Sequence, residues 1–314
     1  MNVGLVLAGG VAKGAYQAGF LQALDEENGL NVTAVSAASI GVLGAYAYSA
    51  SKLDLLSQLW KNVHFDSLVD LSGKVWFKHY LRDIINELVG KDDKLRIPVY
   101  APVCYLPFLH LDYCRMKGDY QKKWYSLMRS AISFPIISGG IRFFRGQISV
   151  DGGLMDNIPI QPLLYNEKQD VILVLHFEAG FRPRRKYLLE NVPIIDYDIS
   201  LNNMFRKHSF DFHGDTLTSM MESGYEYGKQ ICADLFNGGK NGIEELLLFA
   251  EKRKNDELPL RLNNVTFETW VQRANELFYP LIANEGKNVY DVAERKQKKN
   301  SREEYGEYVH KEMS

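Results

Sequence analysis

The sequence is poor in cysteine, has no long apolar run and carries no excess of charge of either sign. Three cysteines in 314 residues are too few for a disulfide framework, which favours a reducing compartment such as the cytoplasm. No stretch reaches the roughly 18 apolar residues that a membrane-spanning helix needs. The apolar run at residues 3–8 lacks the basic leader of a signal peptide. Any contact with a membrane is therefore expected to be peripheral.

The balance of charge and the placement of metal-binding residue types argue against several classes of function. Lysine and arginine number 37 against 39 aspartates and glutamates, a formal net charge of -2, so no basic field would attract nucleic acid. The histidines, cysteines and carboxylates do not have the ligand spacing of zinc or calcium sites. We therefore expect no nucleic-acid partner, no metal and no cofactor.

The N-terminal segment alternates between strand-like and helix-like patterns. Residues 3–7 form a continuous apolar run, which is typical of a strand buried in a parallel sheet. Apolar residues at helical spacing follow, and Asn28-Gly29 is expected to end that helix. Residues 32–35 read as a second strand, and Ser39 opens a second helix. The alternation predicts the α/β class, with three layers (α/β/α) and a mainly parallel central sheet.

Later segments continue this alternation. Further helices are predicted at residues 53–62, 77–88 and 122–132, and further strands at residues 97–106, 109–114, 147–150 and 171–176. Three prolines, Pro98, Pro102 and Pro107, fall in or beside the first two of these strands. Because proline cannot donate a ladder hydrogen bond, we expect these strands to be edges or to be interrupted.

A domain boundary is predicted near residue 239. The apolar pattern of a helix at residues 217–235 is followed by Asn237-Gly238-Gly239, which is typical of a helix end. Residues 1–239 are therefore predicted to form the α/β domain, and residues 240–314 a helical C-terminal extension. The extension should hold helices at 243–254 and 267–282 and a charged tail at 294–314.

Ser39 has the surroundings of a nucleophile. The segment VSAASIG at residues 35–41 runs from a strand directly into a helix, with small residues on both sides of Ser39. This is the pattern of a nucleophile elbow, in which a tight turn holds the hydroxyl above the sheet and Gly41 lets strand and helix approach closely. The first glycine of the usual G-x-S-x-G is replaced by Ala37. A helix N-cap serine would explain the same segment without catalysis.

A glycine-rich loop and an aspartate supply the other parts of a hydrolase site. The segment GGVAKG at residues 9–14 lies between a strand and a helix, where backbone N–H groups can stabilise an oxyanion or bind a phosphate. Asp151 ends a strand and precedes Gly152-Gly153. In contact with Ser39 it can accept the hydroxyl proton as a general base, and burial would raise its pKa. Alone, it would also fit a turn aspartate.

These segments together resemble the patatin-like phospholipase family, the lipid acyl hydrolases with a Ser-Asp dyad. The G-G-G-x-R/K-G motif of the family is matched at residues 9–14, with Val11 in place of the third glycine. Its G-x-S-x-G elbow corresponds to residues 37–41, and its D-G-G-x-x-x-N-x-P pattern to residues 151–159. The resemblance covers about the first 180 residues, with a weaker likeness to Gly228.

The resemblance implies a patatin-like fold and a phospholipase A or lysophospholipase type of esterase that needs no metal or cofactor. It implies Ser39 as the nucleophile, Asp151 as the base, and an oxyanion hole made by the N–H groups of the glycine-rich loop. The implied oxyanion residues are Gly9, Gly10 and Val11, and the implied supporting residues are Lys13, Gly14, Gly41, Gly152 and Gly153. The expected partner is a phospholipid or other acyl lipid at a membrane surface, which the basic segment at residues 181–186 would approach.

Two other functions fit parts of the same sequence. A Ser-His-Asp esterase would use His176, His208 or His213. A non-catalytic module that binds lipid or phosphate would keep the scaffold, and the departures at Val11 and Ala37 leave room for it.

Overall fold

The computed structural model describes residues 1–27, 30–63, 71–135, 141–178, 181–199, 209–262 and 289–291 of the 314-residue chain. The strands are β1 (Asn2–Leu7), β2 (Asn31–Ala37), β3 (Lys94–Leu106), β4 (His110–Asp119), β5 (Arg142–Phe144), β6 (Gln147–Asp151), β7 (Val171–His176), β8 (Ile194–Asp198) and β9 (Val289–Asp291). The helices are α1 (Gly14–Glu26), α2 (Gly41–Ser49), α3 (Leu53–Lys61), α4 (Leu71–Leu88), α5 (Lys122–Ala131), α6 (Gln161–Asn166) and α7 (Gly214–Leu262). Short 3-10 turns are η1 (Val11–Lys13), η2 (Gly152–Leu154) and η3 (Tyr187–Leu189).

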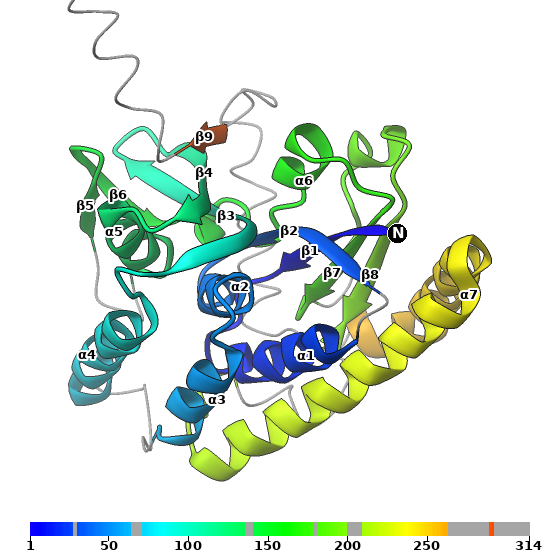
Figure 1. The fold of residues 1–314 in the computed structure, drawn as a ribbon, viewed down its shortest axis with the longest axis horizontal. Helices are drawn as coiled ribbons and strands as arrows, with labels where there is room; N and C mark the ends of the chain where they lie inside the picture. The colour runs from blue at the N-terminus through cyan, green and yellow to red at the C-terminus, as the bar shows by residue number, and fades with distance from the viewer. Residues whose placement is uncertain are drawn as a thin grey trace, which may run out of the picture.

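The described strands form one sheet in the order β5-β6-β3-β2-β1-β7-β8, with β4 beside β3 and β9 beside β4. The pairs β1–β2, β1–β7, β2–β3 and β7–β8 are parallel, whereas β4 and β6 run antiparallel to β3. In Figure 1, α6 lies on one side of the sheet and α1 and α7 lie on the other, so that the sheet is the middle of three layers. The predicted α/β class with a mainly parallel sheet is confirmed.

The central strands are apolar because both of their faces are covered. Every residue of β7 is buried, and β1 is buried from Val3 to Leu7. Strands covered on both faces by helices have this continuous apolar pattern instead of an alternating one. The parallel strands β1, β2 and β7 therefore form the buried centre of the sheet, and their C-terminal ends share one edge of the sheet.

Of the two outcomes predicted from the prolines, β3 has the interruption and not the edge position. It is an interior strand, with β4 on one side and with β2 and then β6 on the other. Pro98 lies at a shift in the register with β4, and Pro102 lies between the last residue paired with β2, Tyr100, and the first paired with β6, Val103. Both prolines thus fall where the hydrogen-bond ladder is already interrupted. Pro107 follows the end of β3, as an interruption would.

α7 corrects the predicted helix end. It continues through Asn237-Gly238-Gly239 and includes the helix predicted at 243–254. A glycine ends a helix when it adopts a left-handed conformation; inside a helix it costs only about 1 kcal/mol, and extension of an existing helix is cooperative. Ile243 beyond the three residues is buried in the core. The division of the chain at residue 239 therefore does not coincide with a helix end, and it stays a prediction.

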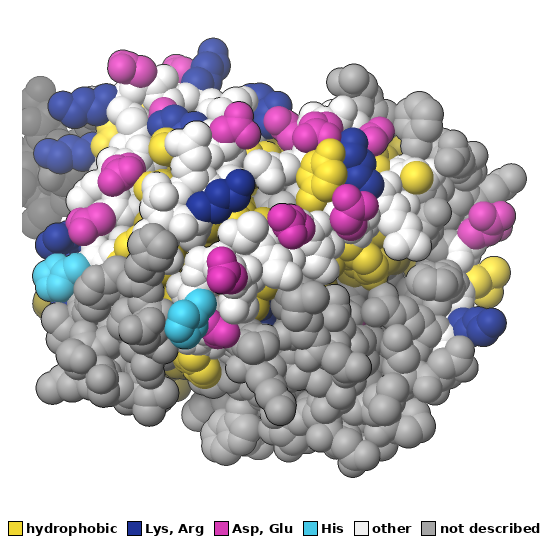
Figure 2. Space-filling view, turned by 90° about the horizontal axis from the view of Figure 1, so that it is seen from below, with side chains coloured by type: hydrophobic (Ala, Val, Ile, Leu, Met, Phe, Trp, Pro, Cys, Tyr) yellow, Lys and Arg dark blue, Asp and Glu magenta, His cyan; other side chains and the backbone are white. Residues whose placement is uncertain are grey.

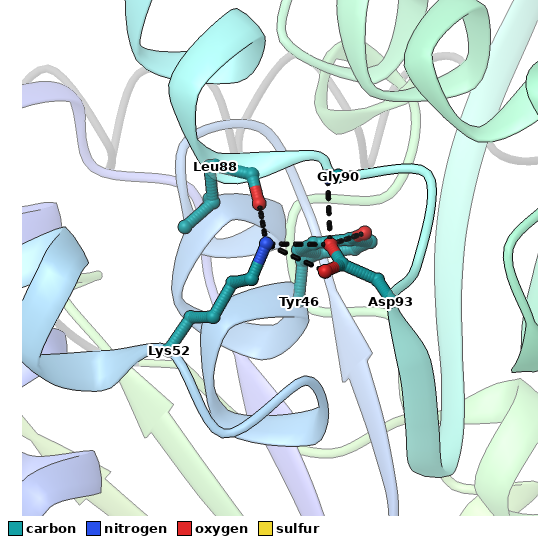
Figure 3. A network of polar contacts seen from close by, with 5 residues as sticks. All are labelled: Tyr46, Lys52, Leu88, Gly90 and Asp93. Carbon is teal, nitrogen blue, oxygen red and sulfur yellow. Dashed lines mark hydrogen bonds and ion pairs between the residues drawn. The ribbon is translucent and has the colours of Figure 1, made fainter.

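A polar network fixes α2 against the loop that leads into β3 (Figure 3). Lys52 Nζ lies 2.6 Å from Asp93 Oδ1 and donates a hydrogen bond of 2.7 Å to the carbonyl of Leu88. The hydroxyl of Tyr46 and the N–H of Gly90 both donate to Asp93 Oδ2. Despite its burial, Asp93 has a lowered pKa because these donors stabilise its charged form. The network joins α2, which follows the elbow, to α4 and β3.

The remaining predicted helices and strands are present in the described part of the chain. Asn28-Gly29, His208, the helix at 267–282 and the charged tail at 294–314 lie outside the described residues. The described chain has no helix that is long and apolar enough to cross a membrane. The three cysteines are free and buried. On the face shown in Figure 2, acidic and basic side chains are interspersed.

Candidate active site

Ser39 lies in a strained turn between β2 and α2. The N–H of Ala38 donates to the carbonyl of Leu7 at the end of β1, and α2 begins two residues after Ser39. Ser39 has a φ of 50°, in the left-handed region that non-glycine residues rarely adopt. A Cβ on Gly41 would lie 3.0 Å from the carbonyl oxygen of Leu7, so helix and strand nearly touch here. This strand–turn–helix geometry is that of a nucleophile elbow.

Asp151 is a buried carboxyl at the end of β6. Its Oδ1 accepts a hydrogen bond of 2.7 Å from the N–H of Gly153. Burial raises its pKa to about 7, while the Ser39 hydroxyl and the Gly153 N–H act in the opposite direction by stabilising the charge. Within the described chain, Oδ2 has no partner at ordinary hydrogen-bond length. Ser39 therefore lowers the pKa of the carboxyl, although no hydrogen bond to Oδ2 is formed among the described residues.

The two glycines after Asp151 have different functions. A Cβ on Gly152 would lie 2.3 Å from the carbonyl carbon of Pro102, so only glycine lets the chain pass this close to β3. Gly153 donates to the Asp151 carboxyl, and a Cβ here would lie 3.0 Å from Asp151 Oδ1. The two glycines therefore let the chain after Asp151 pass close to β3 and provide an N–H donor to Asp151 Oδ1.

Asn157 holds the glycine-rich loop beside Asp151. Its Oδ1 accepts from the N–H of Gly9 and its Nδ2 donates to the carbonyl of Gly9, both at 3.2 Å. Its Nδ2 also donates to Glu178 Oε1 at 2.6 Å. A Cβ on Gly9 would lie 2.7 Å from Ser39 Cβ, so this loop is directly next to the serine. Because its N–H is bonded to Asn157, Gly9 does not have a free donor for an oxyanion.

The next two residues of the loop keep free N–H groups. Within the described chain, neither the N–H of Gly10 nor that of Val11 has a hydrogen-bond acceptor. A Cβ on Gly10 would lie 2.6 Å from the ring of Phe177, which explains the glycine. Val11 has a φ of 52°, a left-handed conformation that is unfavourable for a β-branched residue. These two N–H groups are therefore available to a bound oxyanion or phosphate.

The other predicted supporting residues pack around the loop. Lys13 is fully buried, with Nζ 5.1 Å from the centre of the Phe177 ring. A Cβ on Gly14 would lie 3.0 Å from both Ile40 and Trp60, so α1 begins in close contact with the elbow. Of the nine other predicted site residues, Gly9, Gly14 and Gly153 lie against residues 38–40 of the elbow, and Gly41 begins the helix that follows it. The structure adds Glu178, which follows β7 and carries no motif of its own.

The described histidines do not form a triad with Ser39. His176 is fully buried in β7, with Nε2 3.3 Å from Asp196 Oδ2, and its Nδ1 accepts from the N–H of Glu178. His213 lies on the surface beside Asp211. Among the described residues, no histidine hydrogen-bonds to Ser39 or Asp151. His176 is therefore a core residue whose ring nitrogens both have partners.

The basic segment at residues 181–186 makes structural contacts. Arg184 lies 4.0 Å from Asp156 Oδ1, and the other oxygen of Asp156 accepts from the hydroxyl of Tyr113. Burial raises the pKa of Asp156, against the stabilising charge of Arg184. Arg184 therefore already has an ion-pair partner in the buried carboxylate of Asp156. Within the described chain, no group of three acidic, histidine or cysteine side chains could hold a metal ion.

Comparisons with known proteins show what this chain is similar to. A family model described as Patatin-like phospholipase matches residues 5–164, a range that contains Ser39 and Asp151. The lysophospholipase NTE1 of two strains of Cryptococcus neoformans var. neoformans serotype D is 30% identical over 190 residues, which is 55% of this chain and 11% of the relative. The chain thus spans about a tenth of the length of these curated relatives. VipD from Legionella pneumophila aligns over 90% of this chain and 80% of its own, with 14% identity and a TM-score of 0.33.

Proposed function

The chain belongs to the patatin-like phospholipase family, and on this premise we propose that it cleaves carboxylic ester bonds of membrane lipids as a phospholipase A or lysophospholipase. The family is one of lipid acyl hydrolases, and the similar curated relatives are lysophospholipases by name. The observation that carries the proposal is the meeting of Ser39, in its left-handed turn, with a buried Asp151 whose pKa is about 7. A base with a pKa near the working pH is the most effective proton acceptor.

In the proposed acylation, the Ser39 hydroxyl attacks the carbonyl carbon of the ester. Asp151 accepts the hydroxyl proton as the new C–O bond forms, and the carbonyl oxygen becomes the oxyanion of a tetrahedral intermediate. Collapse of the intermediate breaks the ester bond, and the leaving alcohol takes the proton from Asp151. The fatty acyl group then remains on Ser39 as an ester.

In the proposed deacylation, a water molecule replaces the alcohol. Asp151, ionised again, accepts a proton from the water while the oxygen of the water attacks the acyl carbon. The second tetrahedral intermediate then collapses and releases the fatty acid. Asp151 returns the proton to Ser39 Oγ as this oxygen leaves. Because Asp151 Oδ1 is held by the N–H of Gly153, Oδ2 is the oxygen that performs both proton transfers.

The oxyanion is best assigned to the N–H groups of Gly10 and Val11. The sequence suggested three donors, but the N–H of Gly9 is used by Asn157, and this supports a positioning role for Gly9. Loss of one oxyanion donor typically costs about 10²–10³-fold in rate. Lys13, buried beside this loop, adds positive potential near the developing charge.

We also propose that the enzyme meets its lipid at a membrane surface and works in the cytoplasm. Ester bonds of membrane lipids lie at the bilayer surface, so an enzyme that cleaves them in place binds there peripherally. Three free, buried cysteines support a reducing compartment.

The binding-module alternative is weakened by the geometry of the dyad. A protein that only binds lipid has no use for a buried carboxyl with a pKa of about 7 beside a strained serine, since both features cost stability. The Ser-His-Asp alternative finds no support among the described histidines, of which His110, His176 and His213 contact Asp112, Asp196 and Asp211.

Labelling by a fluorophosphonate, which traps activated serines, tests the proposed nucleophile. We expect the wild type to gain one label, located on Ser39 by peptide mass spectrometry, and Ser39→Ala to gain none. Ser36→Ala is the matched control, because Ser36 is a buried hydroxyl on β2 three residues earlier and should not affect labelling. A label on another residue, or equal labelling of Ser39→Ala, would contradict the proposal.

A further inference from the structure

A basic pocket is lined by residues of α4, of α5 and the turn after it, and of β5. Its lining does not include Ser39 or Asp151, although the carbonyl of Ser133 in the lining accepts a hydrogen bond from the N–H of Asp151. It has about 240 Å³ of space, including space that is open to solvent. Its lining contains Lys78, Leu81, Arg82, Ile85, Arg129, Ile132, Ser133 and Arg142. Four of these side chains are cations and none is acidic. The apolar members form the floor, since Leu81, Ile85 and Ile132 belong to the core.

Among the described residues, three of the four cations have no acidic partner. Arg82 is exposed and forms an ion pair with Asp83. Within the described chain, Lys78, Arg129 and Arg142 form no ion pair with a carboxylate. Arg142 Nε is buried and has no hydrogen-bond partner in the part of the chain that the structure describes. A buried guanidinium donor without an acceptor is costly, and such groups in folded proteins usually point to an unseen partner.

The cations also repel one another. Burial lowers the pKa of Arg142, and the charge of Arg129 lowers it further. Two guanidinium groups placed together without a counter-charge destabilise the fold, because each disfavours the charge of the other. An anion between them would remove this repulsion and would give Arg142 Nε an acceptor.

We propose that this pocket binds a phosphate monoester group. A phosphate monoester carries a charge of about -1.5 to -2 at neutral pH, which matches three cations that have no acidic partner among the described residues better than a carboxylate does. Guanidinium groups bind phosphate oxygens through paired N–H donors. The hydroxyl of Ser133, also in the lining, is occupied by the carbonyl of Ser130, so the arginines are the principal ligands.

The residues beside Arg142 indicate where such a phosphate would come from. Ile141 and Phe143, its two neighbours in the chain, are 58% and 74% exposed, although they are large and apolar. Ile148, which pairs with Phe143, is also exposed. β5 is an edge strand among the described strands, so these side chains and the pocket flank the same edge. Apolar side chains beside phosphate-binding cations suit a lipid headgroup, which presents a phosphate above acyl chains.

The test uses the full chain with Ser39→Ala, so that no lipid is consumed and binding does not depend on the proposed catalysis. Vesicles of phosphatidylcholine, with or without phosphatidate, are sedimented with the protein. Inorganic phosphate and glycerol 3-phosphate are titrated calorimetrically as soluble probes. The added variants are Arg129→Gln with Arg142→Gln, and the matched control Lys123→Gln, an exposed cation on α5 outside the pocket.

We expect the two arginine substitutions to weaken binding to phosphatidate vesicles at least tenfold, about one order of magnitude for lost charge-assisted contacts. Lys123→Gln should change it by less than about twofold, as expected for an exposed charge. Without ligand, the arginine variant should unfold at the same or a higher temperature, because the repulsion is removed. A purely structural role for the arginines would instead lower that temperature.

The two sources of phosphate give different results. Arginine-dependent binding of vesicles that soluble phosphates do not displace would assign the pocket to a lipid headgroup. Arginine-dependent binding of the soluble probes alone would assign it to free phosphate. Equal binding by the arginine variant and Lys123→Gln, or no binding of any probe, would overturn the proposal.

Discussion

At the scale of single residues, the chemistry of Asp151 comes from its burial. Desolvation raises its pKa to about 7, and the donors near it, Ser39 and Gly153, only moderate that rise. The charge of Asp151 also contributes to the raised pKa of the Cys104 thiol, after burial. A dyad therefore does not need a histidine when the carboxylate itself is brought to the pKa range of an imidazole.

The pH dependence of the rate should follow Asp151. The base works only when it is ionised, so kcat/KM for a neutral ester should fall about tenfold per pH unit below an apparent pKa near 7. Initial rates between pH 4.5 and 9 measure this profile. An inflection near 4, the ordinary value for an aspartate, would show that the carboxyl is not desolvated when the enzyme acts.

Val11 carries a backbone conformation that suits the glycine of the family motif. Its φ of 52° costs about 1–2 kcal/mol for an L-residue, although its side chain is buried in the core. Replacement by alanine loses the side-chain contacts and keeps the strain, whereas replacement by glycine loses the contacts and relieves the strain.

We therefore expect Val11→Gly to be more stable than Val11→Ala by about 1 kcal/mol, the reverse of the usual order of the two residues. Urea unfolding of both variants measures the difference. If Val11→Ala is the more stable variant, the left-handed conformation is not present in solution.

Site residues with a sequence motif were predictable, whereas their pairings were not. Ser39 and Asp151 were identified because the tight turns that hold them demand small residues beside them at fixed spacings. Gly10 was identified because a loop with free N–H groups is rich in glycine. The loss of Gly9 as a donor was not predictable, because it depends on Asn157, which is 148 positions away in the chain. The basic pocket was missed for the same reason: Lys78, Arg129 and Arg142 come from three separate elements.

At the scale of elements, the closest contact is that of α1 with α7. A Cβ on Gly224 would lie 2.0 Å from the carbonyl oxygen of Tyr16, and one on Gly19 would lie 1.9 Å from that of Met221. The two helices thus approach through backbone atoms, which cannot move aside as a flexible side chain can. This contact holds α1, whose start lies beside the elbow, against the long helix.

Gly224→Ala should therefore destabilise the protein by about 1–3 kcal/mol or more, as expected for overpacking. Alanine would otherwise favour a helix, so the sign of the effect reports the close contact. Thermal unfolding of Gly224→Ala and of Ser223→Ala, its neighbour on the same helix, makes the comparison. A Gly224→Ala variant as stable as Ser223→Ala would contradict the backbone contact.

Elements governed by local pattern were predicted well, and those governed by neighbours were not. β1, β7 and α5 follow their apolar patterns. β3 can be an interior strand because its partner changes from β2 to β6 at Pro102, where a missing N–H is not needed. α7 continues because Ile243, beyond Gly239, still packs on the core. Neither fact is present in the local sequence.

At the scale of the whole molecule, the C-terminal residues are joined to the α/β unit. Ile243 on α7 belongs to the core, and β9 pairs with β4 from Tyr113 to Arg115. A chain cut at residue 239 would lose both contacts and would shorten α7.

We expect residues 1–239 alone to be less stable than the full chain by about 2 kcal/mol or more, from the lost burial of one large side chain and the exposed strand edge. Urea unfolding of residues 1–239, of residues 1–291 and of the full chain measures this. Equal stability of residues 1–239 would instead support an independent domain that ends at 239.

The central claim is that Ser39 and Asp151 together cleave esters without a metal, and turnover by their variants tests it most directly. Hydrolysis of a medium-chain p-nitrophenyl ester is compared, with EDTA present, for the wild type, Ser39→Ala and Asp151→Asn. Folding is checked by circular dichroism.

The folded-state pKa of Asp151 lies above its unfolded value, so its contribution to stability is present below about pH 4 and is lost as the pH rises through 7. Asp151→Asn should then be at least as stable as the wild type at pH 8.

We predict that the wild type is active, that Ser39→Ala loses about a thousandfold or more, and that Asp151→Asn loses about 10²–10⁴-fold. A folded Ser39→Ala or Asp151→Asn variant with wild-type turnover, or a wild type that EDTA inactivates, would contradict the account.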